Sequence, residues 1–108
     1  MPGFTLTKKA KADLKEIARY TQDQWGRDQR DKYLAMLDGC FHQLAANPFI
    51  GKDCSDIRSG YRKISAGSHV IFYRQTSADV TEIVRILHGS MDIETRLSVG
   101  HIRYRGRT

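Results

Sequence analysis

The sequence predicts an α+β protein: a short N-terminal strand, an α-helical hairpin packed on an antiparallel β-sheet, and a short C-terminal helix. Two observations lead to this prediction. Apolar residues recur at helical spacing through residues 8–46, and three runs rich in β-branched and aromatic residues follow between residues 61 and 87. A block of helices followed by a block of strands is typical of α+β domains rather than of alternating α/β folds.

The N-terminal segment predicts a strand and then a helix. Phe4–Leu6 alternates apolar and polar residues but is too short to be stable as a strand alone. Thr7 is a suitable N-cap, because its hydroxyl can accept a hydrogen bond from a backbone N–H of the first turn. A buried stripe that reaches Trp25 predicts a helix over Lys8–Trp25, and Gly26 suits the left-handed position that ends it.

A second helix is predicted from Asp28, its expected N-cap, to about Ala46. Pro48 ends this helix, since it restricts the preceding Asn47 to extended conformations. The two helices therefore form a hairpin. Residues 48–60 contain two glycines and no periodicity, which predicts a loop.

Three consecutive strands are predicted over Tyr61–Ala66, His69–Thr76 and Val80–Leu87. Gly67-Ser68 forms the first turn between them, because glycine tolerates the positive φ that a two-residue hairpin loop needs. The last strand has apolar residues on both faces. It is therefore expected in the interior of the sheet, covered on both sides.

The C-terminal part divides into a helical turn over Ser90–Leu97 and a basic tail. We expect one domain over residues 1–97 and a tail over residues 98–108 that contacts a partner through its arginines. These tail arginines are Arg103, Arg105 and Arg107.

Composition limits the classes of partner. The chain has 108 residues, enough for one domain, and carries a net charge of +6 from 18 Lys and Arg against 12 Asp and Glu. This balance favours anionic partners, such as nucleic acid or an acidic protein. No apolar run approaches the ~20 residues that a membrane span needs, and the first residues lack the apolar middle of a signal peptide. We expect a cytoplasmic protein without membrane contact.

The sequence contains no recognisable cofactor or metal motif. Cys40 and Cys54 have neither metal-ligand nor CxxC spacing and are expected to be reduced thiols. The four histidines are scattered, and no phosphate-binding glycine-rich loop occurs. His88 ends a strand and precedes Gly89, where an imidazole could transfer protons in a cleft or make a structural hydrogen bond.

Arginines and tyrosines accumulate on the predicted sheet and on the loop before it. Cations mixed with stacking rings are typical of surfaces that bind nucleic acid. The alternative is a solvated face with salt bridges to Glu82 or Asp79. The residues concerned are Arg58, Tyr61, Arg62, Tyr73, Arg74 and Arg85.

Two motifs, residues 67–74 (GSHVIFYR) and residues 85–92 (RILHGSMD), give the chain a specific resemblance to a known family. Together with Trp25-Gly26, Asn47-Pro48 and Gly51, they make it similar to the ParE toxins of the RelE/ParE superfamily over about residues 4–97. The fold of that family agrees with the order of elements predicted here.

This resemblance implies the toxin of a type II toxin–antitoxin module. Such toxins poison DNA gyrase, block replication and help to retain plasmids, and a ParD-like antitoxin holds each inactive. The toxin would have no catalytic residue and no cofactor, and would reach DNA only indirectly, through gyrase or the antitoxin. The expected target-binding residues are Arg58, Arg62, His69, Tyr73, Arg74, Arg85 and His88.

Two other functions remain open. The RelE branch of the superfamily cleaves mRNA on ribosomes, and here Arg62, Arg85 and His88 would be its catalytic residues. That branch tends to place arginine near Val70 and a basic residue near Ser90. Val70 can neither bind a phosphate nor act as an acid, and this argues against mRNA cleavage. The chain could also be a non-toxic relative that acts as a binding module.

Overall fold

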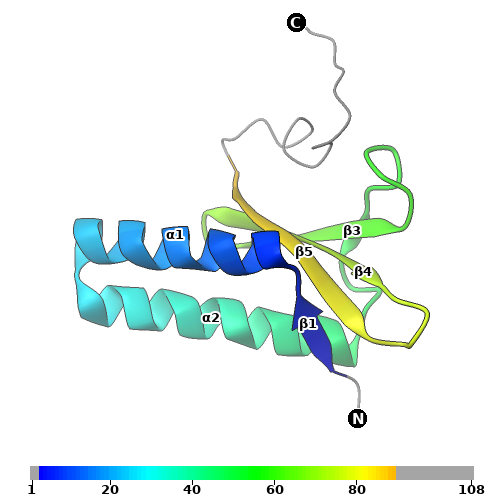
Figure 1. Cartoon of the computed structure of the whole chain (residues 1–108), viewed down its shortest axis with the longest axis horizontal. Coiled ribbons are helices and arrows are strands. Elements are labelled where there is room, and N and C mark those ends of the chain that lie inside the picture. The colour runs from blue at the N-terminus through cyan, green and yellow to red at the C-terminus, as the bar shows by residue number, and fades with distance from the viewer. Residues whose placement is uncertain (1–2, 90–108) are drawn as a thin grey trace, which may run out of the picture.

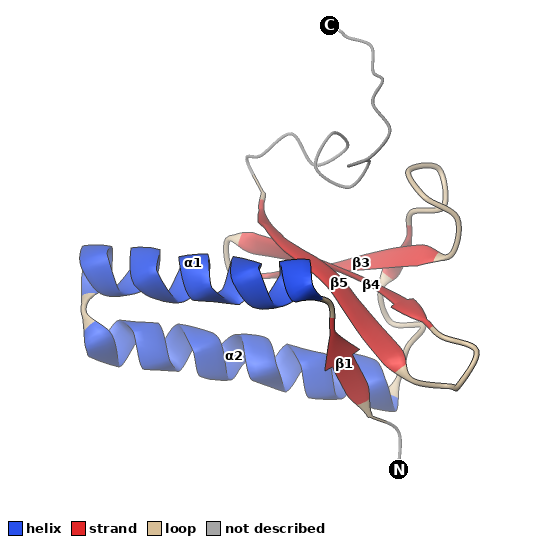
Figure 2. Cartoon of the chain, in the orientation of Figure 1, coloured by secondary structure: helices blue, strands red, loops and turns tan. Residues whose placement is uncertain are grey.

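The computed structural model describes residues 3–89 and shows a helical hairpin against one face of a sheet (Figures 1 and 2). The predicted helix over Lys8–Trp25 is confirmed at both ends. The predicted turn over Ser90–Leu97 and the tail lie outside the described residues. In chain order the elements are β1 (Phe4–Leu6), α1 (Lys8–Trp25), α2 (Arg27–Ala46), β2 (Lys52–Asp53), β3 (Tyr61–Ala66), β4 (His69–Gln75) and β5 (Thr81–His88).

The five strands form one mixed sheet in the order β1-β5-β4-β3-β2. Strands β3 to β5 pair antiparallel, as expected. The prediction of a loop throughout residues 48–60 is wrong at Lys52–Asp53, which pairs antiparallel with β3 as β2. Strand β1 lies parallel to β5, with Phe4 opposite Thr81 and Leu6 opposite Ile83. Because β1 covers only the first half of β5, the second half of that edge faces α1. The interior position predicted for the last strand is confirmed.

Capping residues define the start of α1 and the junction between the two helices. Thr7 caps α1 as predicted: its hydroxyl accepts from Ala10 N at 3.0 Å and donates to Val84 O at 2.8 Å. Gly26, with φ of 91°, is both the C-cap of α1 and the N-cap of α2. The N-cap predicted at Asp28 is wrong, because a one-residue connection starts α2 at Arg27. Asp28 instead lies in the first turn, where its charge favours the helix dipole.

The hydrophobic core fills the layer between the helices and the sheet. Leu37 and Leu44 of α2 pack with Ile71 and Ile83 of the sheet, and all four are fully buried. On the opposite face, a smaller cluster around Phe72 lies under the loop that precedes β3. No helix in the described part of the chain has the length and apolarity needed to cross a membrane.

Candidate functional site

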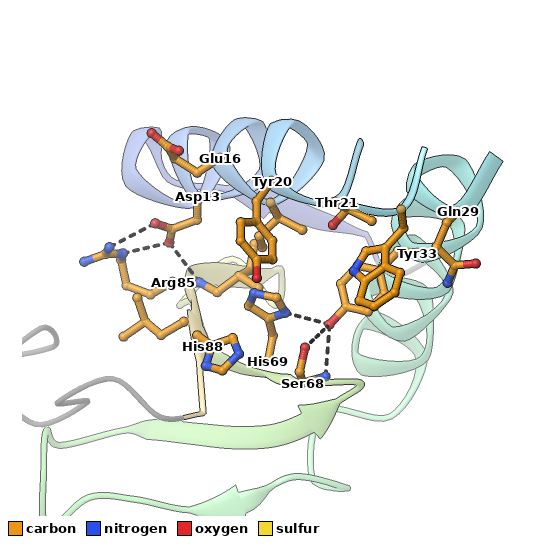
Figure 3. A pocket seen from close by; sticks show the side chains of 14 residues that line it. Asp13, Glu16, Tyr20, Thr21, Gln29, Tyr33, Ser68, His69, Arg85 and His88 are labelled. Carbon is orange, nitrogen blue, oxygen red and sulfur yellow. Dashed lines mark hydrogen bonds and ion pairs between the residues drawn. The ribbon is translucent and has the colours of Figure 1, made fainter. Parts of the chain in front are cut away.

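A pocket of about 1000 Å³ lies between the helical hairpin and the ends of β4 and β5 (Figure 3). Its apolar wall comes from α1, through Ile17, Tyr20 and Trp25. Tyr20 and Trp25 are 63% and 71% exposed, so two large aromatic side chains stand at the rim. The buried position predicted for Trp25 is wrong, because the apolar stripe of α1 extends past the residues that the sheet covers.

Tyr33 of α2 organises the floor of the pocket. Its hydroxyl lies 2.6 Å from His69 Nδ1, and it accepts a hydrogen bond from Ser68 N at 3.0 Å (Figure 3). The ring approaches so closely because the turn carries Gly67, with φ of 61°. A Cβ at that position would lie 2.6 Å from the Tyr33 hydroxyl. The predicted hairpin turn therefore also positions a histidine.

His69 and His88 face each other across neighbouring strands. They are directly paired in the β4–β5 register, and their rings meet edge to face at 5.4 Å between centroids. Burial lowers the pKa of His69, and the neighbouring His88 lowers it further. His69 is therefore neutral at pH 7, and its Nδ1 then shares one hydrogen bond with the Tyr33 hydroxyl. Proton transfer and hydrogen bonding to a partner are both within reach of such a pair.

Asp13 and Arg85 form the polar end of the pocket. Asp13 Oδ2 accepts from Arg85 Nε at 2.8 Å and Oδ1 accepts from Nη2 at 2.9 Å (Figure 3). Asp13 Oδ2 also accepts from Ile86 N at 2.9 Å, on the edge of β5 that β1 leaves open. The hydrogen bonding of the Arg85 guanidinium to the Asp13 carboxylate raises the pKa of Arg85. This arginine joins α1 to the sheet.

The remaining predicted arginines lie away from the pocket. Arg74 forms an exposed ion pair with Glu82 at 2.8 Å, which is the salt-bridged alternative that the sequence had left open. Arg62 donates to Gly51 O at 2.7 Å and lies over the ring of Phe49. Arg58 is exposed and lies 6.0 Å from the centre of another ring, that of Tyr61.

Tyr73 is part of the core. Its side chain is 1% exposed, and its hydroxyl donates to Pro48 O at 2.7 Å and accepts from Gly51 N at 2.9 Å. Burial raises the pKa of this hydroxyl, which therefore keeps its proton. The prediction that Tyr73 contacts a target is contradicted by its burial.

Of the seven predicted target-binding residues, three meet in the pocket: His69, Arg85 and His88. Sequence reasoning missed Tyr33 and the rim residue Tyr20. The tail arginines Arg103, Arg105 and Arg107 lie outside residues 3–89. Within that range, no group of three or more His, Cys, Asp or Glu residues could hold a metal ion.

Comparison with known families gives one match that spans most of the chain. The model described as the ParE toxin of the type II toxin–antitoxin system parDE matches residues 4–93. Toxin ParE1 of Mycobacterium tuberculosis is 47% identical over 94 residues, which are 87% of this chain and 96% of that protein. Toxin ParE1 of Caulobacter vibrioides is 37% identical, over 90% of this chain and 99% of its own length.

Solved structures with the same fold come from both branches of the superfamily. A chain of the chromosomal ParDE system from P. aeruginosa superposes with a TM-score of 0.70 at 20% identity, covering 82% of this chain and 96% of that one. A chain of the toxin–antitoxin complex RelBE2 from Mycobacterium tuberculosis gives 0.60, also at 20% identity, with coverages of 82% and 99%. The predicted α+β fold is confirmed, while the fold alone does not separate the two branches.

Proposed function

The chain belongs to the ParE toxin family of type II toxin–antitoxin systems, and we propose that it poisons DNA gyrase and is neutralised by a ParD-like antitoxin. The observation that supports the antitoxin part of this proposal is the pocket: an aromatic-rimmed recess at the helical hairpin, of the kind that takes an amphipathic helix. The gyrase part is supported by membership of the ParE toxin family. In this role the protein is a binding toxin of the cytoplasm, not an enzyme.

The pocket fits the antitoxin better than it fits a phosphate. Arg85, the only arginine among the described residues that line it, is already paired with Asp13, and Glu16 adds a second carboxylate nearby. Apolar residues of an antitoxin segment would instead lie between Tyr20 and Trp25. The net charge of +6 favours acidic residues elsewhere in that segment. Burial of apolar area would offset the cost of ordering the segment.

The arrangement of the basic residues argues against mRNA cleavage. Arg62 and His88 lie at opposite ends of the sheet: Arg62 is paired with Tyr73, and His88 with His69. The four residue steps along β4 from His69 to Tyr73 span about 13 Å. Arg62, Arg85 and His88 therefore do not converge on one phosphate group.

A ribosome-dependent mRNA interferase is the second candidate, because His69 and His88 place two imidazoles side by side in a pocket. It predicts cleaved message on ribosomes in the presence of the wild-type protein and none with His88→Ala. Intact message with an active wild-type toxin would exclude it.

The experiment that tests the gyrase proposal is a supercoiling assay. Purified protein, freed of antitoxin, is titrated into DNA gyrase with relaxed plasmid and ATP. We expect supercoiling to be lost and cleaved DNA to accumulate. Normal supercoiling at high excess of folded protein would contradict the proposal.

The tail is proposed as an auxiliary contact with the gyrase–DNA complex. Deletion of residues 98–108 removes Arg103, Arg105 and Arg107 and should weaken binding. If these arginines contact phosphate, the salt dependence of binding should also become flatter. An unchanged slope would show that the tail takes no part.

A further inference from the structure

Four large hydrophobic side chains of the described residues are strongly exposed, and they form two pairs. Tyr20 and Trp25 stand at the rim of the pocket. Phe49 and Ile50, which are 72% and 44% exposed, lie just beyond the other end of α2. The 20 residues of α2 span about 30 Å, so the two pairs are at opposite ends of the helical hairpin.

The second pair belongs to a turn that we call the Phe49 tip, residues 48–51. Three side-chain hydrogen bonds hold its backbone. The buried Tyr73 hydroxyl bonds Pro48 O and Gly51 N, and Arg62 donates to Gly51 O at 2.7 Å. Both side chains that hold the turn come from the sheet, yet the two apolar side chains at its apex point into solvent.

Arg62 also orders one of these apolar side chains. Its guanidinium lies 5.0 Å from the centre of the Phe49 ring, within the range of a cation–π contact. An exposed phenyl ring that is already held loses little conformational entropy when a partner covers it. The tip therefore has two properties of a binding hot spot: a large apolar side chain and a fixed position.

The charges around the tip define the partner that would fit it. Residues 47–63 contain four cations, Lys52, Arg58, Arg62 and Lys63, against the two acids Asp53 and Asp56. A complementary surface would offer an apolar socket for Phe49 and Ile50, bordered by carboxylates.

We propose that the Phe49 tip is the surface through which this protein holds its target, a protein with an apolar socket bordered by carboxylates. This inference rests on the proposed toxin function and assigns the two apolar pairs to two partners: the pocket to the antitoxin, the tip to the target. An antitoxin segment confined to the pocket leaves the tip exposed. Neutralisation then requires the rest of the antitoxin to block this end of the molecule sterically, without contacting Phe49 and Ile50.

The test compares two double variants of the full chain. Phe49→Ser with Ile50→Ser removes the tip, and Tyr20→Ser with Trp25→Ser is the matched control at the pocket. Each is assayed for thermal stability, growth arrest without antitoxin, inhibition of gyrase, and affinity for the antitoxin. We expect the tip variant to inhibit gyrase more weakly by about tenfold or more, and to keep the antitoxin affinity of the wild type. The pocket variant should show the reverse.

Each outcome decides between the assignments. A folded tip variant that still arrests growth and inhibits gyrase overturns the proposal, and so does one that has lost antitoxin affinity. A wild-type dimer that the tip variant dissociates would assign the tip to a second copy of the chain and also overturn it. Should the double variant fail to fold, Ile50→Asp alone keeps the stacking of Arg62 on Phe49 and gives the same readouts.

Failure of the toxin function itself is recognised separately. A wild-type protein that arrests growth without inhibiting gyrase contradicts the gyrase proposal. Growth arrest by the two variants then still tests whether the tip binds the target. A wild-type protein that does neither contradicts both, because no target then exists.

Discussion

Asp13 and Arg85 are 72 positions apart in the sequence and form an ion pair with two hydrogen bonds, of 2.8 and 2.9 Å. Their side chains are only 14% and 15% exposed. The same carboxylate accepts from the backbone of Ile86, on the part of the β5 edge that β1 leaves uncovered. One aspartate of α1 therefore accepts hydrogen bonds both from an open strand edge and from a largely buried cation.

This pair changes the meaning of a mutation at Arg85. The residue was predicted to contact a target, and a loss of activity in Arg85→Ala would have been taken as support. Removal of Arg85 also leaves Asp13 with a carboxylate that is largely buried and without its cation. Activity lost in that variant therefore says nothing about the target unless the folded fraction is measured as well.

Asp13→Asn should lower the free energy of unfolding by about 2 kcal/mol, because Arg85 then loses the charge of its partner in a site of low exposure. Chemical denaturation followed by circular dichroism measures the change. Glu16→Gln is the control, since Glu16 pairs with Arg19 one turn further along α1, where both side chains are exposed. We expect no measurable shift in the control, and equal effects in the two variants would contradict the structural role of Asp13.

The stability of the protein should depend on pH through His69. Its pKa in the folded protein is lowered by burial and by His88, so below pH 6.5 the unfolded chain binds a proton more readily than the folded one. Stability from this group is complete above pH 6.5 and is lost as the pH falls through the folded pKa. The carboxylate of Asp13 opposes the shift, and the Tyr33 hydroxyl contacts the ring.

The measurement is the melting temperature between pH 7.5 and pH 5 for the wild type and for His69→Asn. We expect a fall towards low pH in the wild type and a smaller fall in the variant. His42→Asn, at an exposed site on α2, is the control and should follow the wild type. Parallel curves for all three proteins would show that His69 does not carry the dependence.

The helices and the three main strands could be predicted because their signals are local. Thr7 marks a helix start through its capping hydroxyl, Gly26 and Pro48 mark helix ends by backbone preference, and Gly67 marks a turn by its positive φ. The parallel pairing of β1 depends instead on a segment more than 70 residues away. Strand β2 has two residues, too few for any periodicity.

The site was only partly predictable for the same reason. His69 and His88 each stood out, but their pairing follows from the register of two strands. That register shifts between Phe72 and Tyr73, and the shift leaves Val84 without a partner in β4. The internal partners of Arg85 and Tyr73 could not be predicted, because the sequence does not show which buried or half-buried polar groups are hydrogen-bonded within the protein.

Arg62→Lys should separate a role in positioning the tip from a role of charge alone. Lysine keeps the positive charge, but it lacks the planar group that stacks on Phe49 while donating to Gly51 O. If Arg62 holds the tip, gyrase inhibition should weaken about fivefold, which corresponds to the net free energy of about one hydrogen bond. Lys52→Arg, an exposed exchange beside the tip, is the control. Full inhibition by Arg62→Lys would show that charge alone matters.

Two glycine-to-alanine substitutions test whether the tip is held rigidly. A Cβ on Gly51 would run into the Tyr73 hydroxyl and lie 2.8 Å from Lys63 O, a backbone atom that cannot easily move. Gly51→Ala should therefore lower the free energy of unfolding by about 2 kcal/mol, through overpacking and the loss of the bond from Gly51 N to Tyr73. Gly39, within α2, has open space around it, so Gly39→Ala should stabilise by about 0.5–1 kcal/mol.

The two variants should also differ in function at temperatures where both are fully folded. Gly51→Ala moves the backbone that carries Phe49 and Ile50, so gyrase inhibition should fall while antitoxin affinity, set at the other end of α2, stays unchanged. Gly39→Ala should alter neither. Denaturation curves, supercoiling assays and antitoxin titrations on the same preparations make the comparison. A folded Gly51→Ala protein with normal inhibition would mean that the target tolerates a displaced tip, and preorganisation would then not explain its binding.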